Sequence, residues 1–229
     1  MSLFVIAKSN DEAICFMPST NLNIQLNDIG KKFGKEWIFK NINLTINSGD
    51  KLVILGGNGS GKSTLLQIIS GYVLPNAGEL IYDLEGKSID KEEYQKYLSL
   101  ASPYLDLIED YTLEEIINHC AIYKPFLKNL DTIKIIELSG LTSAKNKFIK
   151  NYSSGMRQRV RLTLAILADC PILLLDEPVS NLDKTAIDWF KTLIKEYASH
   201  KTIIVCSNSI KEEYEFCTKE LNVADYKKN

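Results

Sequence analysis

The sequence predicts an α/β protein in which a mostly parallel sheet follows an N-terminal antiparallel β subdomain and carries an inserted helical subdomain. Residues 23–46 alternate between apolar and polar side chains, as strands with one buried face do. Two short runs, 51–55 and 172–175, are almost wholly apolar and fit strands buried on both faces. Residues from about 103 to 165 instead place their apolar side chains at helical spacing.

The chain has 229 residues, 45% of them hydrophobic, which suffices for one substantial core. We expect one domain over residues 22–229 after an extension, 1–21, in which two apolar patches fit a hairpin. The formal net charge of -2 shows no excess of basic residues, so nucleic acid is not an expected partner. No apolar run approaches the ~20 residues of a membrane helix, so any membrane role must come through a partner chain.

The five cysteines are scattered, with no C-x-x-C pair and no clustered histidines. This distribution argues against a zinc site and against a disulfide framework. We therefore expect free thiols in a reducing cytosol.

Phe33 lies at a turn between the antiparallel strands, upstream of a glycine-rich stretch. An aromatic ring at such a position is more often part of a core than a ligand contact. A nucleotide site nevertheless needs a platform on which the base can stack. Both interpretations of Phe33 stay open on residue type alone.

A glycine-rich turn joins the apolar run 51–55 to a helix with apolar side chains at helical spacing. Glycine lets the backbone wind tightly and aim successive N–H groups at one centre, where the helix dipole also favours an anion. Lys62 would reach the β- and γ-phosphates of a nucleoside triphosphate, Ser63 would complete the Mg²⁺ shell, and Thr64 could donate to the α-phosphate. This pattern predicts a P-loop NTPase core. The predicted phosphate-binding residues are Gly56, Gly57, Asn58, Gly59, Ser60, Gly61, Lys62, Ser63 and Thr64.

The helical insert follows a short apolar strand over residues 97–101. Thr112 is predicted to cap its first helix with Glu115 as the capping-box partner, and a second helix is expected over 131–140. Ser153 is a natural N-cap for a third, longer helix. The hydroxyl, the first N–H groups and the dipole of that helix also fit an anion, so a plain helix start and a binding role remain alternatives.

Asp176 and Glu177 follow the apolar run 172–175 directly. They therefore stand at the carboxyl end of a core strand, where ligands bind in open α/β sheets. Asp176 would hold Mg²⁺ through the metal's waters, and Glu177 would polarise the attacking water as a general base. The alternative is that the Asp-Glu-Pro segment is only a polar helix cap.

The last part of the chain predicts four further elements. A helix with an apolar face follows Asp183, and a core strand covers 202–206. A last helix is expected after Lys211, with a short terminal strand around 221–223. No internal repeat is present.

Taken in order, these motifs resemble the nucleotide-binding subunit of ATP-binding cassette (ABC) transporters, over roughly residues 22–225. The order is a P-loop, a helical insert, the signature 152–156, the strand and carboxylates at 172–177, and the segment 180–183. The resemblance implies ATP and Mg²⁺ as cofactors and ATP hydrolysis as the activity. Lys62 and Glu177 would be its catalytic residues.

The resemblance also assigns roles that residue type alone does not. It implies that Phe33 stacks on adenine and that two cassettes face each other head to tail. Ser153 and Gly155 of one cassette would then close over the ATP held by the other, with Asp183 at the interface. The second cassette could be an identical or a different chain.

A transmembrane permease subunit is the other implied partner, which would place the chain on the cytoplasmic face of a membrane. The stretch 103–107 and Tyr111 lie where transporter cassettes receive a short helix from that subunit. Two other functions stay open. The chain could be a soluble ABC-type ATPase, or a nucleotide-sensing cassette of low activity that pairs with a competent partner.

The sequence departs from the family's usual pattern in three places, which involve four residues. Ser102 stands where a Gln usually contacts Mg²⁺ and the attacking water, and it is too short to reach the same atoms directly. Asn208 stands where a His usually contacts the γ-phosphate, and an amide can donate to phosphate but carries no charge. Ser154 and Met156 replace the usual Gly and Gln of the signature.

Overall fold

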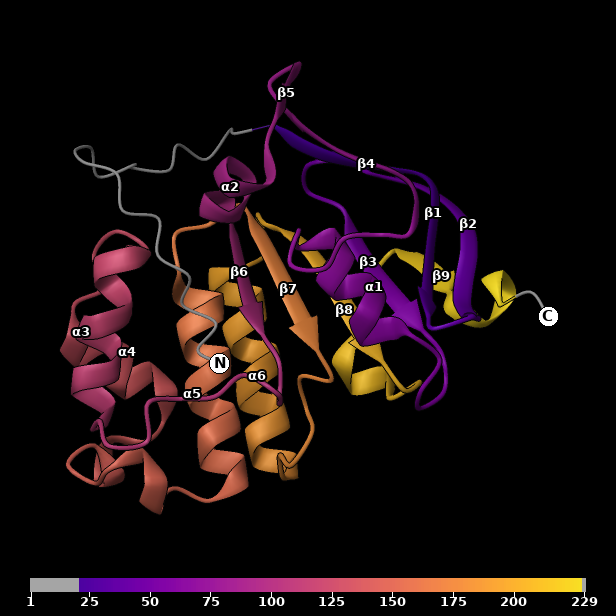
Figure 1. The fold of residues 1–229 in the computed structure, drawn as a ribbon. Helices are drawn as coiled ribbons and strands as arrows, with labels where there is room; N and C mark the ends of the chain where they lie inside the picture. The colour runs from indigo at the N-terminus through magenta and orange to yellow at the C-terminus, as the bar shows by residue number, and fades with distance from the viewer. Residues whose placement is uncertain (1–20, 228–229) are drawn as a thin grey trace.

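The computed structural model describes residues 21–227, so the hairpin predicted in the N-terminal extension lies outside the described residues. Two sheets organise the fold (Figure 1). The antiparallel sheet has the order β2-β1-β4-β5 and the parallel sheet the order β6-β7-β8-β3-β9. This arrangement confirms the predicted α/β fold with an antiparallel β subdomain.

The antiparallel sheet contains β1 (Leu22–Phe33), β2 (Glu36–Ile46), β4 (Ala77–Leu84) and β5 (Lys87–Ile89). The parallel sheet contains β6 (Leu98–Ala101), β7 (Ile172–Asp176), β8 (Thr202–Ser207), β3 (Lys51–Leu55) and β9 (Lys219–Asn222). Six α-helices are described: α1 (Lys62–Ile69), α2 (Lys91–Tyr94), α3 (Leu113–Tyr123), α4 (Thr132–Ser139), α5 (Ser154–Leu167) and α6 (Lys184–Tyr197). Five 3₁₀ turns are η1 (Gln95–Tyr97), η2 (Thr142–Ala144), η3 (Ile149–Asn151), η4 (Lys211–Glu213) and η5 (Val223–Tyr226).

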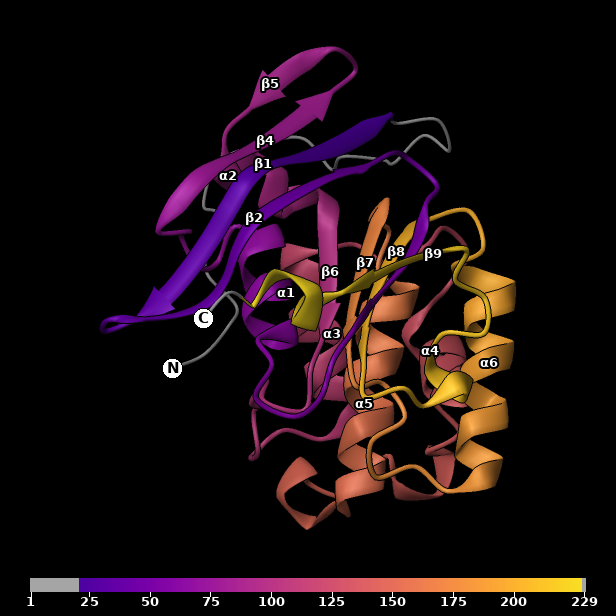
Figure 2. The ribbon, with the colours of Figure 1, turned by 90° about the vertical axis from the view of Figure 1, so that its right-hand side faces the viewer.

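The parallel sheet is buried on both faces because alternate side chains of its strands enter two different cores. Leu173 and Leu175 of β7 pack in one core with α3–α6, while Ile172 and Leu174 pack in the other with α1 and the antiparallel sheet. Figure 2 shows α1 between the two sheets and α5 and α6 on the opposite face. Burial on both faces explains why the runs 51–55 and 172–175 are almost wholly apolar.

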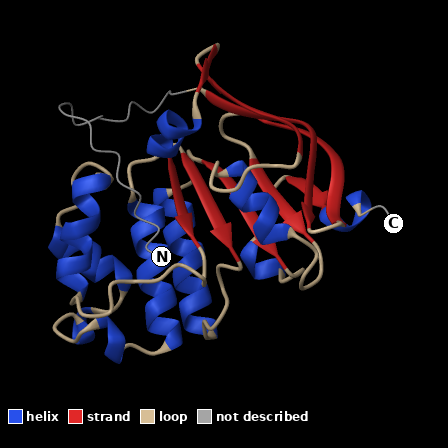
Figure 3. Ribbon diagram, viewed as in Figure 1, coloured by secondary structure: helices blue, strands red, loops and turns tan. Residues whose placement is uncertain are grey.

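The helical insert forms its own cluster at one side of the parallel sheet (Figure 3). Thr112 and Glu115 make the predicted capping box at the start of α3. Gly140 ends α4 in a left-handed conformation, with φ of 65°, which glycine adopts without strain. Within residues 21–227, no helix combines the length and the apolar character that crossing a membrane requires.

The prediction of a last helix after Lys211 was wrong. The chain makes only the 3₁₀ turn η4 there before it enters β9. Because β9 runs parallel to β3, the chain must return along the sheet between Ser207 and Lys219. A helix advances about 1.5 Å per residue against about 3.3 Å for extended chain, so a short return segment favours turns and extended backbone.

Candidate functional site

The register of the parallel sheet gathers four of the predicted site segments at one edge. Leu55 pairs with Ser207, Asp176 pairs with Cys206, and Ala101 pairs with Leu175. All these strands run in the same direction, so their carboxyl ends meet. The residues that follow them are the P-loop, Asn208, Glu177 and Ser102.

The P-loop has the backbone that its glycines permit. Gly56, Gly59 and Gly61 have φ of 155°, 74° and 102°, values that other residues rarely adopt. A Cβ on Gly61 would lie 2.4 Å from Cγ2 of Ile38 on β2, so this position also needs glycine for lack of space. The loop opens α1 from its amino end, where N–H groups and the helix dipole favour an anion.

Lys62 is 4% exposed and turns its ammonium back toward the P-loop. Its Nζ donates to the carbonyl oxygens of Gly56 at 2.9 Å and Gly57 at 3.1 Å, and to Oδ1 of Asn208. The buried charge is therefore compensated within the chain. A phosphate oxygen could take the place of one of these neutral acceptors.

Asp176 receives two hydroxyl donors, one on each carboxylate oxygen. Ser63 Oγ donates to Oδ1 at 3.1 Å and Ser102 Oγ donates to Oδ2 at 3.2 Å. Burial raises the pKa of Asp176, the two hydroxyls oppose that shift, and the neighbouring charge of Glu177 adds to it. Ser102 thus lies next to the predicted metal ligand. The prediction that it is too short to reach Mg²⁺ and the attacking water directly stays a prediction.

Asn208 and Glu177 are in direct contact. Asn208 donates Nδ2 to Oε1 of Glu177 at 2.8 Å while its Oδ1 accepts from Lys62. The amide therefore bridges a cation and an anion, which it can do because it carries both a donor and an acceptor. Glu177 itself has φ of 46° and donates its backbone N–H to Cys206 at 3.0 Å. This backbone turn points the carboxylate away from the strand direction and toward Asn208.

Other predicted residues lie on separate surface elements. Ser153 is the exposed N-cap of α5, and its hydroxyl accepts from the N–H of Met156 at 3.2 Å. Gly155 approaches the carbonyl oxygen of Asn181 so closely that a Cβ would lie 2.8 Å from it. Phe33 is 65% exposed at the end of β1. Asp183 is the exposed N-cap of α6.

Sequence reasoning missed two buried residues near this site. Glu213, on η4, lies close enough to Glu177 and Asp176 for their charges to raise its pKa. Gln158, on α5, donates Nε2 to the carbonyl oxygen of Pro178 at 3.0 Å. Neither residue stands out in the sequence. Glu213 belongs to an acidic stretch that resembles the solvated face of a helix.

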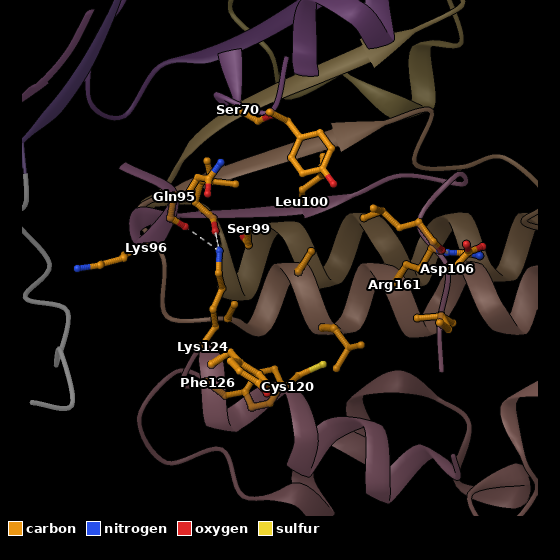
Figure 4. A pocket seen from close by; sticks show the side chains of 18 of the residues that line it. Ser70, Gln95, Lys96, Ser99, Leu100, Asp106, Cys120, Lys124, Phe126 and Arg161 are labelled. Atoms are coloured by element: carbon orange, nitrogen blue, oxygen red, sulfur yellow. Dashed lines mark hydrogen bonds between the residues drawn. The ribbon is translucent and has the colours of Figure 1, made fainter. Parts of the chain in front are cut away.

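A groove of about 280 Å³ opens between the parallel sheet and the helical insert (Figure 4). β6 forms one wall, α5 another, and the end of α3 with Phe126 closes the third side. Lys124 stands in it and donates Nζ to the carbonyl oxygens of Gln95 and Leu98. The remaining lining is mainly apolar and includes Leu100, Leu105, Leu107 and Leu164.

The residues at the sheet edge fit a magnesium-bound triphosphate. Ser63 and Asp176 present hard oxygen ligands, which Mg²⁺ prefers. The P-loop offers the N-terminus of α1 and a lysine, and the hydroxyl of Ser60 is buried without a hydrogen-bond partner among residues 21–227. A buried hydroxyl of this kind is satisfied when a polar ligand binds beside it.

Comparison with known proteins agrees with this geometry. The pattern of a protein family described as "ABC transporter" matches residues 39–180, which include the P-loop, Ser153, Gly155, Asp176 and Glu177. YdbJ of Bacillus subtilis, described as an uncharacterized ABC transporter ATP-binding protein, is 31% identical over 199 residues, which are 85% of this chain and 64% of YdbJ. The chain thus spans about two thirds of that relative's length.

Two further proteins extend the comparison. The lantibiotic transport ATP-binding protein SrtF of Streptococcus pyogenes is 25% identical over 195 residues, which are 84% of this chain and 82% of SrtF. The structure of MJ0796, described as a dimeric bacterial ABC transporter cassette, superimposes with a TM-score of 0.72 at 25% identity and covers 87% of this chain and 93% of that one. The chain therefore belongs to the ABC transporter family, of which it carries the ATP-binding domain.

Proposed function

We propose that the chain hydrolyses ATP and thereby powers transport by a separate membrane subunit. The observation that carries this proposal is the arrangement of Lys62, Asp176 and Glu177 at one sheet edge, linked by Ser63 and Asn208. A catalytic base, a phosphate-binding lysine and a set of metal ligands are the parts that phosphoryl transfer to water requires.

Each residue has a proposed role in this reaction. The P-loop residues 56–64 and Lys62 hold the phosphates, while Ser63 and Asp176 hold Mg²⁺ with Ser102 supporting Asp176. The metal, when bound, neutralises charge on the phosphates. Glu177 takes a proton from the attacking water, and Asn208 orients the Glu177 carboxylate.

We propose that the active form is a pair of cassettes, as the resemblance to ABC transporters implies. Ser153 and Gly155 lie on α5 rather than at the P-loop edge, and Ser153 is exposed, which fits contact with ATP held by a second cassette. Phe33 is exposed and available to stack on adenine. The dimeric state described for MJ0796 supports this proposal by analogy.

The groove between β6 and α5 is the proposed docking site for a short helix of the membrane subunit. Leu107 lines this groove and is only partly buried, while Tyr104, three residues earlier in the chain, is 75% exposed and Tyr111 is partly buried. Apolar side chains in a concave groove suit an amphipathic helix. Docking there would place the chain on the cytoplasmic face of a membrane.

ATP turnover by the purified chain tests the catalytic proposal. We expect Glu177→Gln to lower kcat by about 100-fold or more while ATP still binds, because Gln cannot accept the proton of water. Glu212→Gln is the matched control, since Glu212 is exposed on η4. Equal turnover in wild type and Glu177→Gln would remove Glu177 from its role.

The same assay separates the nucleotide-sensing alternative. A sensing cassette would bind ATP and turn over no faster than Glu177→Gln. The contact between Asn208 and Glu177 favours hydrolysis over sensing, because it orients the base even though the usual His is absent.

Co-purification with a membrane chain tests docking. We expect Leu107→Glu to weaken recovery of the membrane partner, because a charge would enter the apolar groove. Ile133→Glu is the control, since Ile133 is 70% exposed on α4 and does not line the groove. If both variants recover the same polytopic membrane chain in equal amounts, the groove is not the docking site. If the wild type recovers no polytopic chain, the result favours a soluble ABC-type ATPase.

A further inference from the structure

Glu213 is a buried carboxyl to which the proposed reaction assigns no role. It ends η4, five residues after Asn208, and is 1% exposed. Its Oε1 accepts from the backbone N–H of Val179 at 3.4 Å, and its Oε2 has no hydrogen-bond partner among residues 21–227. A buried carboxylate with an unpaired oxygen is costly, so a site that retains one needs a physical explanation.

Glu213 connects the two segments that carry Glu177 and Asn208. Val179 belongs to the turn that follows Glu177, and Ser207 directly precedes Asn208. The Val179 N–H donates to the Glu213 carboxyl. The Ser207 hydroxyl, which donates to the carbonyl oxygen of Ile210, lies close enough to the carboxyl to lower its pKa. The Asn208–Glu177 contact joins the same two segments a second time. Glu213 therefore joins the same two segments as the Asn208–Glu177 hydrogen bond does.

The surroundings of Glu213 favour its neutral form. Asp176 and Glu177 face it from the end of β7, and the Cys206 thiol and the Ser207 hydroxyl face it from β8. Burial raises the pKa of Glu213 to about 7, the nearby Ser207 hydroxyl and the Val179 N–H lower it, and the charges of Glu177 and Asp176 raise it. A proton on the carboxyl removes a negative charge beside two others.

We propose that Glu213 is a positioning residue that holds the turn after Glu177 against the turn that carries Asn208. The inference rests on the proposed ATPase function, because the contact that it braces is the one that orients the catalytic base. When the Glu213 side chain is removed, the hydrogen bond to Val179 is lost and the space behind the two turns empties. Neither turn would then keep the spacing that the Asn208–Glu177 hydrogen bond requires.

Three variants of the full chain test the proposal: Glu213→Gln, Glu213→Ala and Glu212→Gln. Gln has the shape of Glu and keeps an oxygen that can accept from the Val179 N–H, so it retains the contact. We expect Glu213→Gln to keep kcat and KM for MgATP within about twofold of wild type. Glu213→Ala should lower kcat at least about fivefold at pH 7 with KM for MgATP unchanged within about twofold. The exposed Glu212→Gln should follow the wild type throughout.

Amide hydrogen exchange provides a readout that does not depend on hydrolysis. Peptides covering residues 177–182 should exchange faster in Glu213→Ala than in wild type, while Glu213→Gln should protect them as the wild type does at pH 6.5. A loss of kcat in Glu213→Gln as large as in Glu213→Ala, or unchanged exchange in Glu213→Ala, would overturn the proposal. Absence of turnover in the wild type would instead contradict the ATPase function, and the exchange result would still decide whether Glu213 braces the two turns.

Discussion

Replacing Glu213 by Gln should change how the stability of the protein depends on pH. The pKa of Glu213 is about 7 in the folded chain, against 4.5 for an unperturbed Glu. Between these two values the folded state binds more protons than the unfolded state, so the free energy of unfolding falls as pH rises. The difference of about 2.5 pKa units corresponds to about 3 kcal/mol lost between about pH 4.5 and pH 7.

Denaturant unfolding at a series of pH values measures this loss. Glu213→Gln does not titrate, so its stability relative to wild type should increase by about 2.5 kcal/mol between pH 5 and pH 8. Glu212→Gln controls for the loss of a surface charge. A difference between Glu213→Gln and wild type that stays constant with pH would refute the argument that burial holds this carboxyl neutral.

Two further predictions concern residues that the structure places at the P-loop. Asn208→Ala removes the bridge between Lys62 and Glu177, so kcat should fall roughly tenfold or more in a steady-state ATPase assay; unchanged turnover would show that Glu177 needs no orienting amide. Alanine at position 61 would have both a strained φ and a steric clash. Alanine at position 49, where φ is 84° and no atom lies close, would have only the strained φ. The Tm of Gly61→Ala should therefore fall further than that of Gly49→Ala. Thermal unfolding of the two variants compares them directly, and equal losses of Tm would rule out the clash.

Part of the site follows from motifs that are contiguous in the sequence. The P-loop, the apolar strand before Asp176 and the N-cap at Ser153 each depend on neighbours within a few residues, so spacing alone predicts their local structure. Glu213 could not be predicted in this way. Its carboxyl is buried where it accepts a hydrogen bond from Val179, 34 positions earlier in the chain. Its backbone belongs to a 3₁₀ turn at a place where the sequence favours a helix.

The position of Ser102 shows the same limit. Residue type and length predict that it cannot do what a Gln does at that position. Only the register between β6 and β7 shows that its hydroxyl lies 3.2 Å from Asp176. A hydrogen bond of that kind depends on where two distant strands end relative to each other.

The sequence by itself determined the fold class, the phosphate loop and the identity of the charged residues, because these depend on periodicity and on short motifs whose geometry is local. The tertiary structure alone decided which of those residues meet. Parallel strands place their carboxyl ends at one edge, and that edge joins Lys62, Asn208 and Glu177 in one hydrogen-bonded chain. Burial, which sets the protonation of Glu213 and raises the pKa of Asp176, is likewise a property of the packed molecule and not of any stretch of its sequence.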